Sequence, residues 1–313
     1  MWQEDQGEPA SVIRVSCQGT DALAEHIVQE EGRLFHERLS ADVQEFHTDR
    51  RSRERRGERK GRPLNDVLVL CYHAVSTDWP APLSVTPERL QRQLELLVRR
   101  GYQGATFHEA VASPRRGKKL VVTFDDAYLS VYELAYPILS SLGLPGTIFV
   151  VTDFADAGRT LGWPGIDHWL DGLHRLELRS LSWDQLRELA GAGWEVGSHT
   201  RTHPMLTALD DEKLAGELRE SRETCETELG RRCASLAYPY GDVDSRVAAA
   251  AAAAGYLAGA ALPARLDHRS PLMMWPRLGI YRKDSLPRFR VKVSPSVRRL
   301  RQALAHGEAY HQD

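Results

Sequence analysis

The chain has 313 residues, 42% of them hydrophobic, which suffices for the core of one sizeable domain and leaves a surplus for smaller appendages. With 41 basic and 43 acidic residues its formal net charge is −2, so no overall field favours nucleic acid as a partner. No segment approaches about 18 consecutive apolar residues, which argues against a transmembrane helix.

The N-terminus and the cysteines indicate the compartment. The first residues are acidic and include no apolar core of a signal peptide, so we expect a cytoplasmic protein. The four cysteines show no C-x-x-C spacing and are expected to be reduced, packed thiols: Cys17, Cys71, Cys225 and Cys233.

Residues 1–65 are expected to form an N-terminal extension that ends in a charged linker. They hold a possible strand at residues 11–17, then a helix with an apolar side, then a run of mixed charge from Arg50 to Lys60. Such a run is typical of a solvated linker. An arm that binds RNA or phosphate is the alternative.

From residue 66 to about 285, strand and helix signals alternate. Alternation of this kind favours parallel strands joined by crossover helices. Short apolar runs indicate strands at 120–124 and 194–197. Capping residues and closing glycines predict helices at 86–101, 182–193 and 244–255.

Two adjacent carboxylates follow the strand expected at 120–124. Successive strand side chains point to opposite faces, so Asp125 and Asp126 can share one site only if the strand ends before them. Ligands bind at the carboxyl ends of strands in parallel α/β architectures, which favours a catalytic role. A helix N-cap followed by an acidic first turn is the structural alternative, and this segment alone leaves both open.

Two histidines four residues apart follow the strand expected at 194–197. His199 and His203 can reach one metal ion from a helical turn, whereas Pro204 favours an irregular loop or a first turn. With one aspartate they offer three N and O ligands and leave a position open, which suits a catalytic divalent ion such as Zn²⁺. The other aspartate then remains for proton transfer.

These residues resemble the motifs of one enzyme family. Residues 123–126 and 199–203 are similar to the T-F-D-D-G and H-[ST]-x-x-H motifs of polysaccharide deacetylases of the NodB-homology type, carbohydrate esterase family 4. Residues 69–75 resemble the family's opening strand and residues 236–241 its third motif. The resemblance spans about residues 66–285 and implies an irregular (β/α) barrel of about seven parallel strands.

The resemblance also implies roles for individual residues. Asp126, His199 and His203 would hold the metal, for which Zn²⁺ is expected although Co²⁺, Ni²⁺ and Fe²⁺ accept the same ligands. Asp125 would be the general base that takes a proton from the attacking water. The backbone N–H of Tyr240 would stabilise the oxyanion formed from an acetamide carbonyl. Without the other motifs, the segment around Tyr240 would be an ordinary turn.

The chain departs from the family pattern at three places. Ala127 stands where the family usually has glycine, so the turn after the aspartates is expected to avoid positive φ. Ala237 stands where many members have an arginine that orients the base. No clear Leu-x-His supplies a general acid near the C-terminus. His268 is nearest by position, but an exposed loop histidine is the favoured interpretation.

Other residues near the motifs are candidates for the same site. Arg277 matches an arginine of shorter family members and is predicted, from position alone, to orient Asp125 in place of the missing arginine. His73 either contacts substrate or is structural. Several tryptophans can stack on a sugar, of which the two that flank the helix at 182–193 are expected in the core: Trp163, Trp169, Trp183, Trp194 and Trp275.

Residues 286–313 are expected to form a basic C-terminal tail in which arginines alternate with apolar residues. An amphipathic helix after Pro295 would allow peripheral contact with an anionic membrane surface. Packing across the barrel is the favoured interpretation.

The sequence thus favours a metal-dependent hydrolase that removes acetyl from an N-acetylated amino sugar of a glycan or glycan precursor. The reaction is hydrolysis of a carbon–nitrogen bond other than a peptide bond. A cytoplasmic location shifts the expected carbohydrate substrate toward a precursor made inside the cell. One alternative is hydrolysis of another C–N or ester bond. Another is a degenerate, carbohydrate-binding family member that keeps the metal but has lost catalytic turnover. The missing arginine and the missing acid histidine leave this alternative open. The oligomeric state is unknown from sequence.

Overall fold

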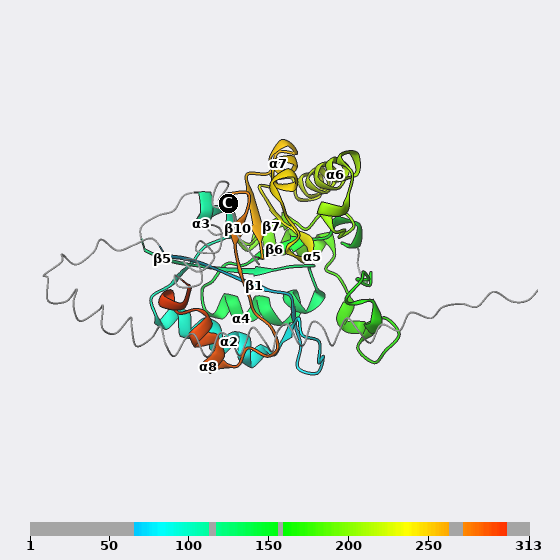
Figure 1. Cartoon of the computed structure of the whole chain (residues 1–313). Coiled ribbons are helices and arrows are strands. Elements are labelled where there is room, and N and C mark those ends of the chain that lie inside the picture. Colours follow the sequence, from blue (N-terminus) through cyan, green and yellow to red (C-terminus); the bar gives the residue numbers. More distant parts are fainter. Residues whose placement is uncertain (1–65, 113–116, 156–158, 263–271, 299–313) are drawn as a thin grey trace, which may run out of the picture. The chain divides into compact units, whose positions relative to one another are not determined.

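The computed structural model describes residues 66–112, 117–155, 159–262 and 272–298 (Figure 1). The chain divides between Arg62 and Pro63, so all of these residues belong to one unit. The expectations for residues 1–65, for His268 and for the tail beyond Arg298 lie outside the described residues. The domain limits at residues 65 and 285 stay predictions.

The strands form one parallel sheet in the order β10-β9-β8-β7-β6-β5-β1-β11, with the short β4 paired to the beginning of β5. A separate pair is formed by β2 and β3. The bounds are β1 Asp66–Tyr72, β2 Ala74–Val75, β3 Ser84–Val85, β4 Gln103–Gly104, β5 Lys118–Phe124, β6 Thr147–Val150, β7 Glu195–Ser198, β8 Ser235–Ala237, β9 Ala258–Ala261, β10 Trp275–Pro276 and β11 Leu278–Gly279.

One segment closes this sheet into a barrel. The two ends of the strand order, β10 and β11, are neighbours in sequence and are separated only by Arg277. β10 pairs with β9 and β11 pairs with β1, both in parallel, and the Arg277 N–H donates to the Ala261 carbonyl at 2.9 Å. The expected irregular barrel of parallel strands is therefore confirmed, and Arg277 lies at its closure.

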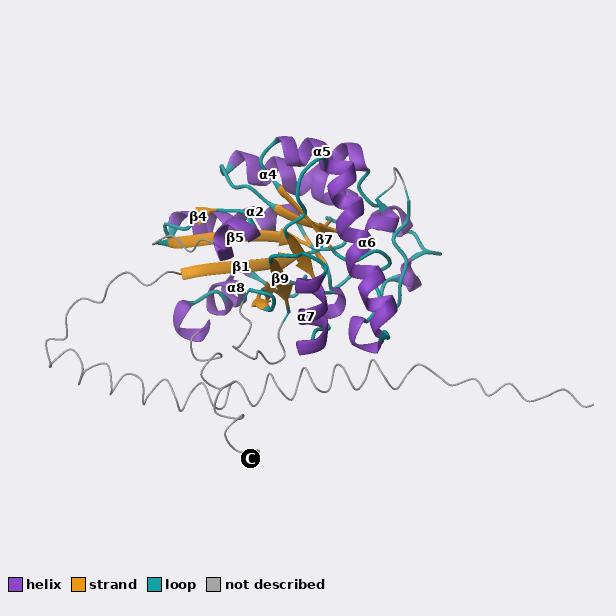
Figure 2. Cartoon of the chain, turned by 90° about the horizontal axis from the view of Figure 1, so that it is seen from above, coloured by secondary structure: helices purple, strands orange, loops and turns teal. Residues whose placement is uncertain are grey.

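Helices surround the strands, as Figure 2 shows from above. Among the described residues, none of them is both long and apolar enough to cross a bilayer. The bounds are α2 Pro87–Arg99, α3 Phe107–Ala112, α4 Tyr136–Ser141, α5 Trp183–Gly191, α6 Asp211–Leu229, α7 Ser245–Ala253 and α8 Leu286–Lys292, with a π-helical turn, Val131–Ala135, ahead of α4.

The ends of three helices follow the predicted caps. The Thr86 side chain accepts the Arg89 N–H at the start of α2, and Ser182 and Gln185 form the expected capping box of α5. Asp244 caps α7 in the same way. Each helix is followed within two residues by a left-handed glycine, as predicted: Gly101, Gly193 and Gly255.

Alternation along the strands separates two groups of buried side chains. Leu68 and Leu70 of β1 pack in the large core between sheet and helices. Val69 points to the other face and joins Val121 and Phe149 in a smaller cluster. Because α3 belongs to this cluster and contacts β1, β5 and β9, we place the cluster inside the barrel.

The tail begins as a packed helix. Phe289 and Val293 are buried, and α8 lies against α2. Packing, the favoured interpretation, is therefore correct for the described part of the tail.

Candidate active site

The interior face of β5 leads directly to the first catalytic candidate. Val121, Thr123 and Asp125 alternate along one face, so the carboxylate continues the row that fills the barrel. The strand itself ends at Phe124, as predicted. Asp125 is therefore a barrel-interior residue at the carboxyl end of a central strand, with 1% of its surface exposed.

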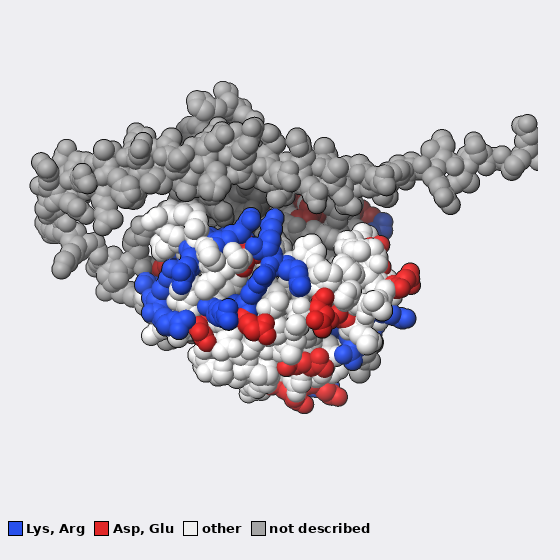
Figure 3. Space-filling view, turned by 90° about the horizontal axis from the view of Figure 1, so that it is seen from below, with Lys and Arg blue, Asp and Glu red and all other residues white. Residues whose placement is uncertain are grey.

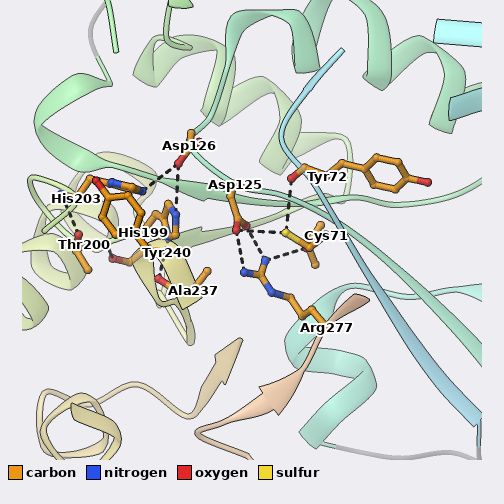
Figure 4. Close-up of polar contacts among 12 residues, drawn as sticks. Cys71, Tyr72, Asp125, Asp126, His199, Thr200, His203, Ala237, Tyr240 and Arg277 are labelled. Carbon is orange, nitrogen blue, oxygen red and sulfur yellow. Dashed lines mark hydrogen bonds and ion pairs between the residues drawn. The ribbon is translucent and has the colours of Figure 1, made fainter. Parts of the chain in front are cut away.

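Arg277 binds Asp125 with both arms of its guanidinium. Nη1 donates to Oδ1 at 2.6 Å and Nη2 to Oδ2 at 2.8 Å, as Figure 4 shows. Nη1 also donates to the Thr123 hydroxyl at 3.0 Å, and the guanidinium lies over the Phe149 ring. The contact that sequence position predicted for Arg277 is present. Arg277 thus gives Asp125 the guanidinium partner that the alanine at position 237 cannot provide.

The ion pair sets the ionisation of Asp125. Burial alone would raise the pKa of this carboxyl, but the Arg277 guanidinium outweighs it and lowers the pKa to about 2. The Cys71 thiol lies 3.4 Å from Oδ2, and burial raises its pKa well above the usual value. At neutral pH an ionised carboxylate thus accepts from a guanidinium and a neutral thiol.

Asp126 points away from Asp125 and toward the two histidines (Figure 4). Its Oδ1 lies 3.3 Å from His199 Nε2 and 3.4 Å from His203 Nε2. All three residues are buried, and one potential ligand atom from each lies within 4.8 Å of the others. The structure therefore brings the three predicted metal ligands together.

The donor set of this cluster fits a cation. His199 Nδ1 lies 2.8 Å from the Ala237 carbonyl, so it carries the proton and leaves a lone pair on Nε2. Asp126 Oδ1 is buried with no hydrogen-bond partner in the described structure. Burial opposes ionisation of Asp126, but the imidazoles outweigh it and lower its pKa. Three buried N and O ligand atoms that converge in this way are what a divalent ion requires.

A sharp turn lets the adjacent aspartates point to different partners. Asp126 has φ 71° and Ala127 has φ 56°, so the prediction that alanine keeps this turn out of positive φ is wrong. A left-handed alanine costs about 1–2 kcal/mol. Its methyl is buried in the large core and its carbonyl accepts the Leu181 N–H at 2.9 Å, contacts that offset this cost.

The histidine segment is an irregular loop and not a helical turn. Thr200 and His203 both have φ 66°. Glu217 of α6 holds the loop, because its carboxylate accepts the N–H groups of Arg201 and Thr202 at 2.9 and 3.0 Å. The irregular loop that Pro204 favoured is thus the correct alternative. The two histidines, four residues apart in sequence, reach the same cluster from this loop.

His203 is positioned by aromatic packing. Its Nδ1 is buried without a hydrogen-bond partner, unlike that of His199. The Trp163 ring stacks on it with centroids 4.1 Å apart, and the Tyr240 ring meets it edge-on at 4.6 Å. Trp163 is only 7% exposed. This indole, a candidate sugar platform from sequence, therefore fixes the orientation of a metal-ligand candidate.

Tyr240 lies in the turn after β8, where its φ is 59°. Its side chain is 47% exposed, the largest exposure among the predicted site residues. The Tyr240 ring, which meets the His203 ring edge-on, therefore borders the site. The remaining tryptophans divide as follows: Trp194 is in the core, as predicted, and Trp169, Trp183 and Trp275 are partly buried.

His73 completes the surroundings of the base. One ring nitrogen of His73 lies within 4.8 Å of a ligand atom of both Cys71 and Asp125, and its Nδ1 has no hydrogen-bond partner. Burial lowers the pKa of this imidazole, so it is neutral at pH 7. His73 is thus a buried, neutral imidazole beside Asp125 with a free ring nitrogen.

Sequence reasoning missed two contributors. Glu217 was not singled out, although a carboxylate between Leu214 and Leu218 on the buried side of a helix is a detectable signal. Cys71 was expected to pack without a role, and nothing in its apolar strand indicates the contact with Asp125.

Comparison with known proteins agrees with the motifs. A family model described as polysaccharide deacetylase matches residues 112–259, which include both aspartates, both histidines and Tyr240. The Bacillus subtilis protein YxkH, named as a polysaccharide deacetylase, is 27% identical over 196 residues, 61% of this chain and 62% of YxkH. The Staphylococcus epidermidis poly-beta-1,6-N-acetyl-D-glucosamine N-deacetylase is 25% identical over 226 residues, 68% of this chain and 69% of that protein.

Solved structures show the same barrel. The Streptococcus pyogenes deacetylase PplD aligns with a TM-score of 0.62 at 22% identity, over 75% of this chain and 100% of that one. IcaB from Ammonifex degensii aligns with a TM-score of 0.59 at 24% identity, over 72% and 95%. Residues 112–259, just under half of the chain, thus match the polysaccharide deacetylase family model, and the solved structures show the same fold.

Proposed function

We propose that the protein is a metal-dependent hydrolase that removes the acetyl group from an N-acetylated amino sugar of a glycan or glycan precursor. One observation carries the proposal: a buried cluster of three potential ligands, Asp126, His199 and His203, lies beside a carboxylate, Asp125, that Arg277 keeps ionised. Hydrolysis needs these two components next to each other. The name of the Staphylococcus epidermidis relative supports an acetamide as the bond cleaved.

Asp126, His199 and His203 would hold the cation, and Zn²⁺ is the ion we propose for two imidazoles and one carboxylate. When bound, a divalent ion polarises the acetamide carbonyl and lowers the pKa of a coordinated water. Nδ1 of His199 remains bonded to the Ala237 carbonyl, which keeps Nε2 available as a ligand.

Asp125 takes the proton from water as its oxygen attacks the carbonyl carbon. A carboxylate has about four lone-pair sites, so Asp125 can accept this proton while it remains bonded to Arg277. The Tyr240 N–H donates to the oxyanion. The C–N bond then breaks, Asp125 returns the proton to the amine nitrogen, and acetate leaves.

His73 hydrogen-bonds the substrate in this scheme. Its imidazole is neutral, because burial lowers its pKa, and the unpartnered Nδ1 is available beside the base. We assign it to positioning the amide, and assign both proton transfers to Asp125.

Arg277 also bears on the degenerate, non-catalytic alternative. That alternative rested on a missing arginine and a missing acid histidine. Arg277 gives Asp125 a guanidinium partner, and Asp125 itself can return the proton. A competent hydrolase therefore agrees better with the geometry.

The function is tested by acetate release from chitooligosaccharides, oligomers of β-1,6-linked N-acetylglucosamine and UDP-linked N-acetyl sugars. We expect release by the wild type, its loss with a chelator and its return with Zn²⁺. Asp125→Asn should lower kcat by about 10²–10⁴-fold with unchanged metal content, because only the base is lost. Asp126→Asn should lose the metal itself.

Acetate release by Asp125→Asn at the wild-type rate would contradict the assigned base. Zinc retention by Asp126→Asn equal to that of the wild type would contradict the ligand set. Metal content by atomic emission and folding by circular dichroism are measured on the same samples.

Arg277→Lys should lower kcat by about tenfold, since the charge remains but the fork that fixes Asp125 is lost. Arg277→Ala leaves a buried carboxylate without its partner and should destabilise the fold by about 3–5 kcal/mol. The measurements are kcat as a function of pH and the thermal midpoint. The acid limb should move to higher pH in the lysine variant, because a weaker partner lets the pKa of Asp125 rise. Full activity with an unmoved acid limb would remove the positioning role.

His73→Gln should keep most of kcat, whereas His73→Ala should raise KM by about tenfold through loss of one hydrogen bond. Glutamine can donate and accept but cannot carry a proton, so the pair separates hydrogen bonding from proton transfer. Equal and large losses of kcat in both variants would assign His73 to proton transfer instead.

We also propose a cytoplasmic location. Cys71, Cys225 and Cys233 are buried free thiols, which a reducing compartment favours. Fractionation of the source cells should recover the protein with the cytoplasmic marker and with its cysteines alkylatable without reductant. Recovery outside the cytoplasmic membrane would overturn this assignment.

A further inference from the structure

A basic groove lies at the end of the barrel opposite the catalytic residues. Arg100 and Tyr102 follow α2, Lys118 begins β5, and Arg290 belongs to α8; Ser294 and Pro295 complete the lining of a volume of about 470 Å³. Asp125 follows the last residue of the same β5. At about 3.3 Å per residue, the strand separates Lys118 from Asp125 by roughly 20 Å.

Lys and Arg side chains gather on the face that carries α2 and α8, whereas Asp and Glu are more frequent elsewhere in the same view (Figure 3). Three basic residues near the groove have carboxylate partners. Arg99 pairs with Glu95, Lys292 pairs with Asp284, and Arg298 pairs with Asp66.

The three cations that line the groove differ from these neighbours. Among the residues that the structure describes, Arg100, Lys118 and Arg290 form no ion pair with a carboxylate. Lys118 Nζ donates to the Arg100 carbonyl at 2.8 Å and lies 5.7 Å from the centroid of the Tyr102 ring. The ammonium group is thus held in place by neutral partners.

The nearest acid is not available to neutralise the groove. Asp66 accepts from the Tyr102 hydroxyl at 2.5 Å through Oδ2 and from Arg298 at 2.6 Å through Oδ1. Tyr102 itself is 5% exposed, so this wall of the groove is fixed by the core. As far as the described residues show, the lining therefore carries three positive charges, the Ser294 hydroxyl and no acid.

We propose that this groove binds a phosphate group. Two guanidinium forks and one ammonium match the several oxygens and the double negative charge of a phosphate better than a single carboxylate. The volume exceeds that of one phosphate and accommodates a diphosphate or a phosphodiester with its neighbouring atoms. The site is separate from the deacetylase chemistry, so the inference does not depend on the proposed function.

Phosphate of this kind reaches the groove either as a soluble ester or as a lipid headgroup. The full chain is titrated with pyrophosphate and with glycerol phosphate by calorimetry. In a second arm it is sedimented with phosphatidylcholine vesicles that do or do not contain phosphatidylglycerol. Binding of the soluble anions would identify the ligand as a soluble phosphate ester. Binding only to the phosphatidylglycerol vesicles would identify it as a lipid headgroup.

Arg290→Glu and Arg99→Glu provide a matched pair. Both are substitutions of exposed arginines on this face and change the net charge equally, but only Arg290 lines the groove. We expect Arg290→Glu to weaken the observed binding by at least about tenfold, the worth of one charge-assisted hydrogen bond. Arg99→Glu should change it by no more than about twofold.

Acetate release is measured on both variants to confirm an intact barrel and should equal that of the wild type. Equal losses of binding in the two variants would contradict a phosphate site in the groove and would indicate diffuse electrostatic attraction to the basic face instead. Failure of the wild type to bind pyrophosphate, glycerol phosphate or the phosphatidylglycerol vesicles would overturn the proposal as a whole.

Discussion

The buried ion pair between Arg277 and Asp125 is the interaction on which the rest of the site depends. Arg277 stands between β10 and β11, where one segment joins both edges of the sheet, and its side chain is fully buried. An unpaired guanidinium there would cost several kcal/mol, so the closing segment needs the carboxylate at the end of β5. The same contact ties the closing segment to β5, orients the base and keeps it ionised.

The neighbouring aspartate is free for a different role because the backbone turns sharply between them. Positive φ at Asp126 directs its carboxylate to His199 and His203, so adjacent residues belong to different chemical groups. The histidines are fixed by unlike means. His199 bonds a carbonyl, and His203 lies between aromatic rings. The active centre therefore depends on β8, on the loop that carries Trp163 and on α6, beyond the two motifs themselves.

Sequence patterns correctly predicted those strand and helix ends that depend only on neighbouring residues. The end of β5 before Asp125, the capping box at Ser182 and the closing glycines follow from side-chain periodicity and backbone conformation, which the sequence displays. Three features could not be predicted from the sequence because they depend on contacts between residues that are far apart in the chain. Ala127 adopts positive φ through its burial, Glu217 holds the histidine loop from another helix, and Trp163 packs on His203. Arg277 was predicted only by family position, since its partner is 152 residues away.

The central claim is that Asp126, His199 and His203 bind one divalent ion while Asp125 stays bonded to Arg277. X-ray absorption at the zinc edge on the reconstituted protein, with anomalous diffraction from its crystals, measures this directly. We expect one ion with two nitrogen and one carboxylate ligands at about 2.0–2.2 Å, and Asp125 outside the coordination sphere. An ion bound by Asp125, or bound away from the two histidines, would contradict it.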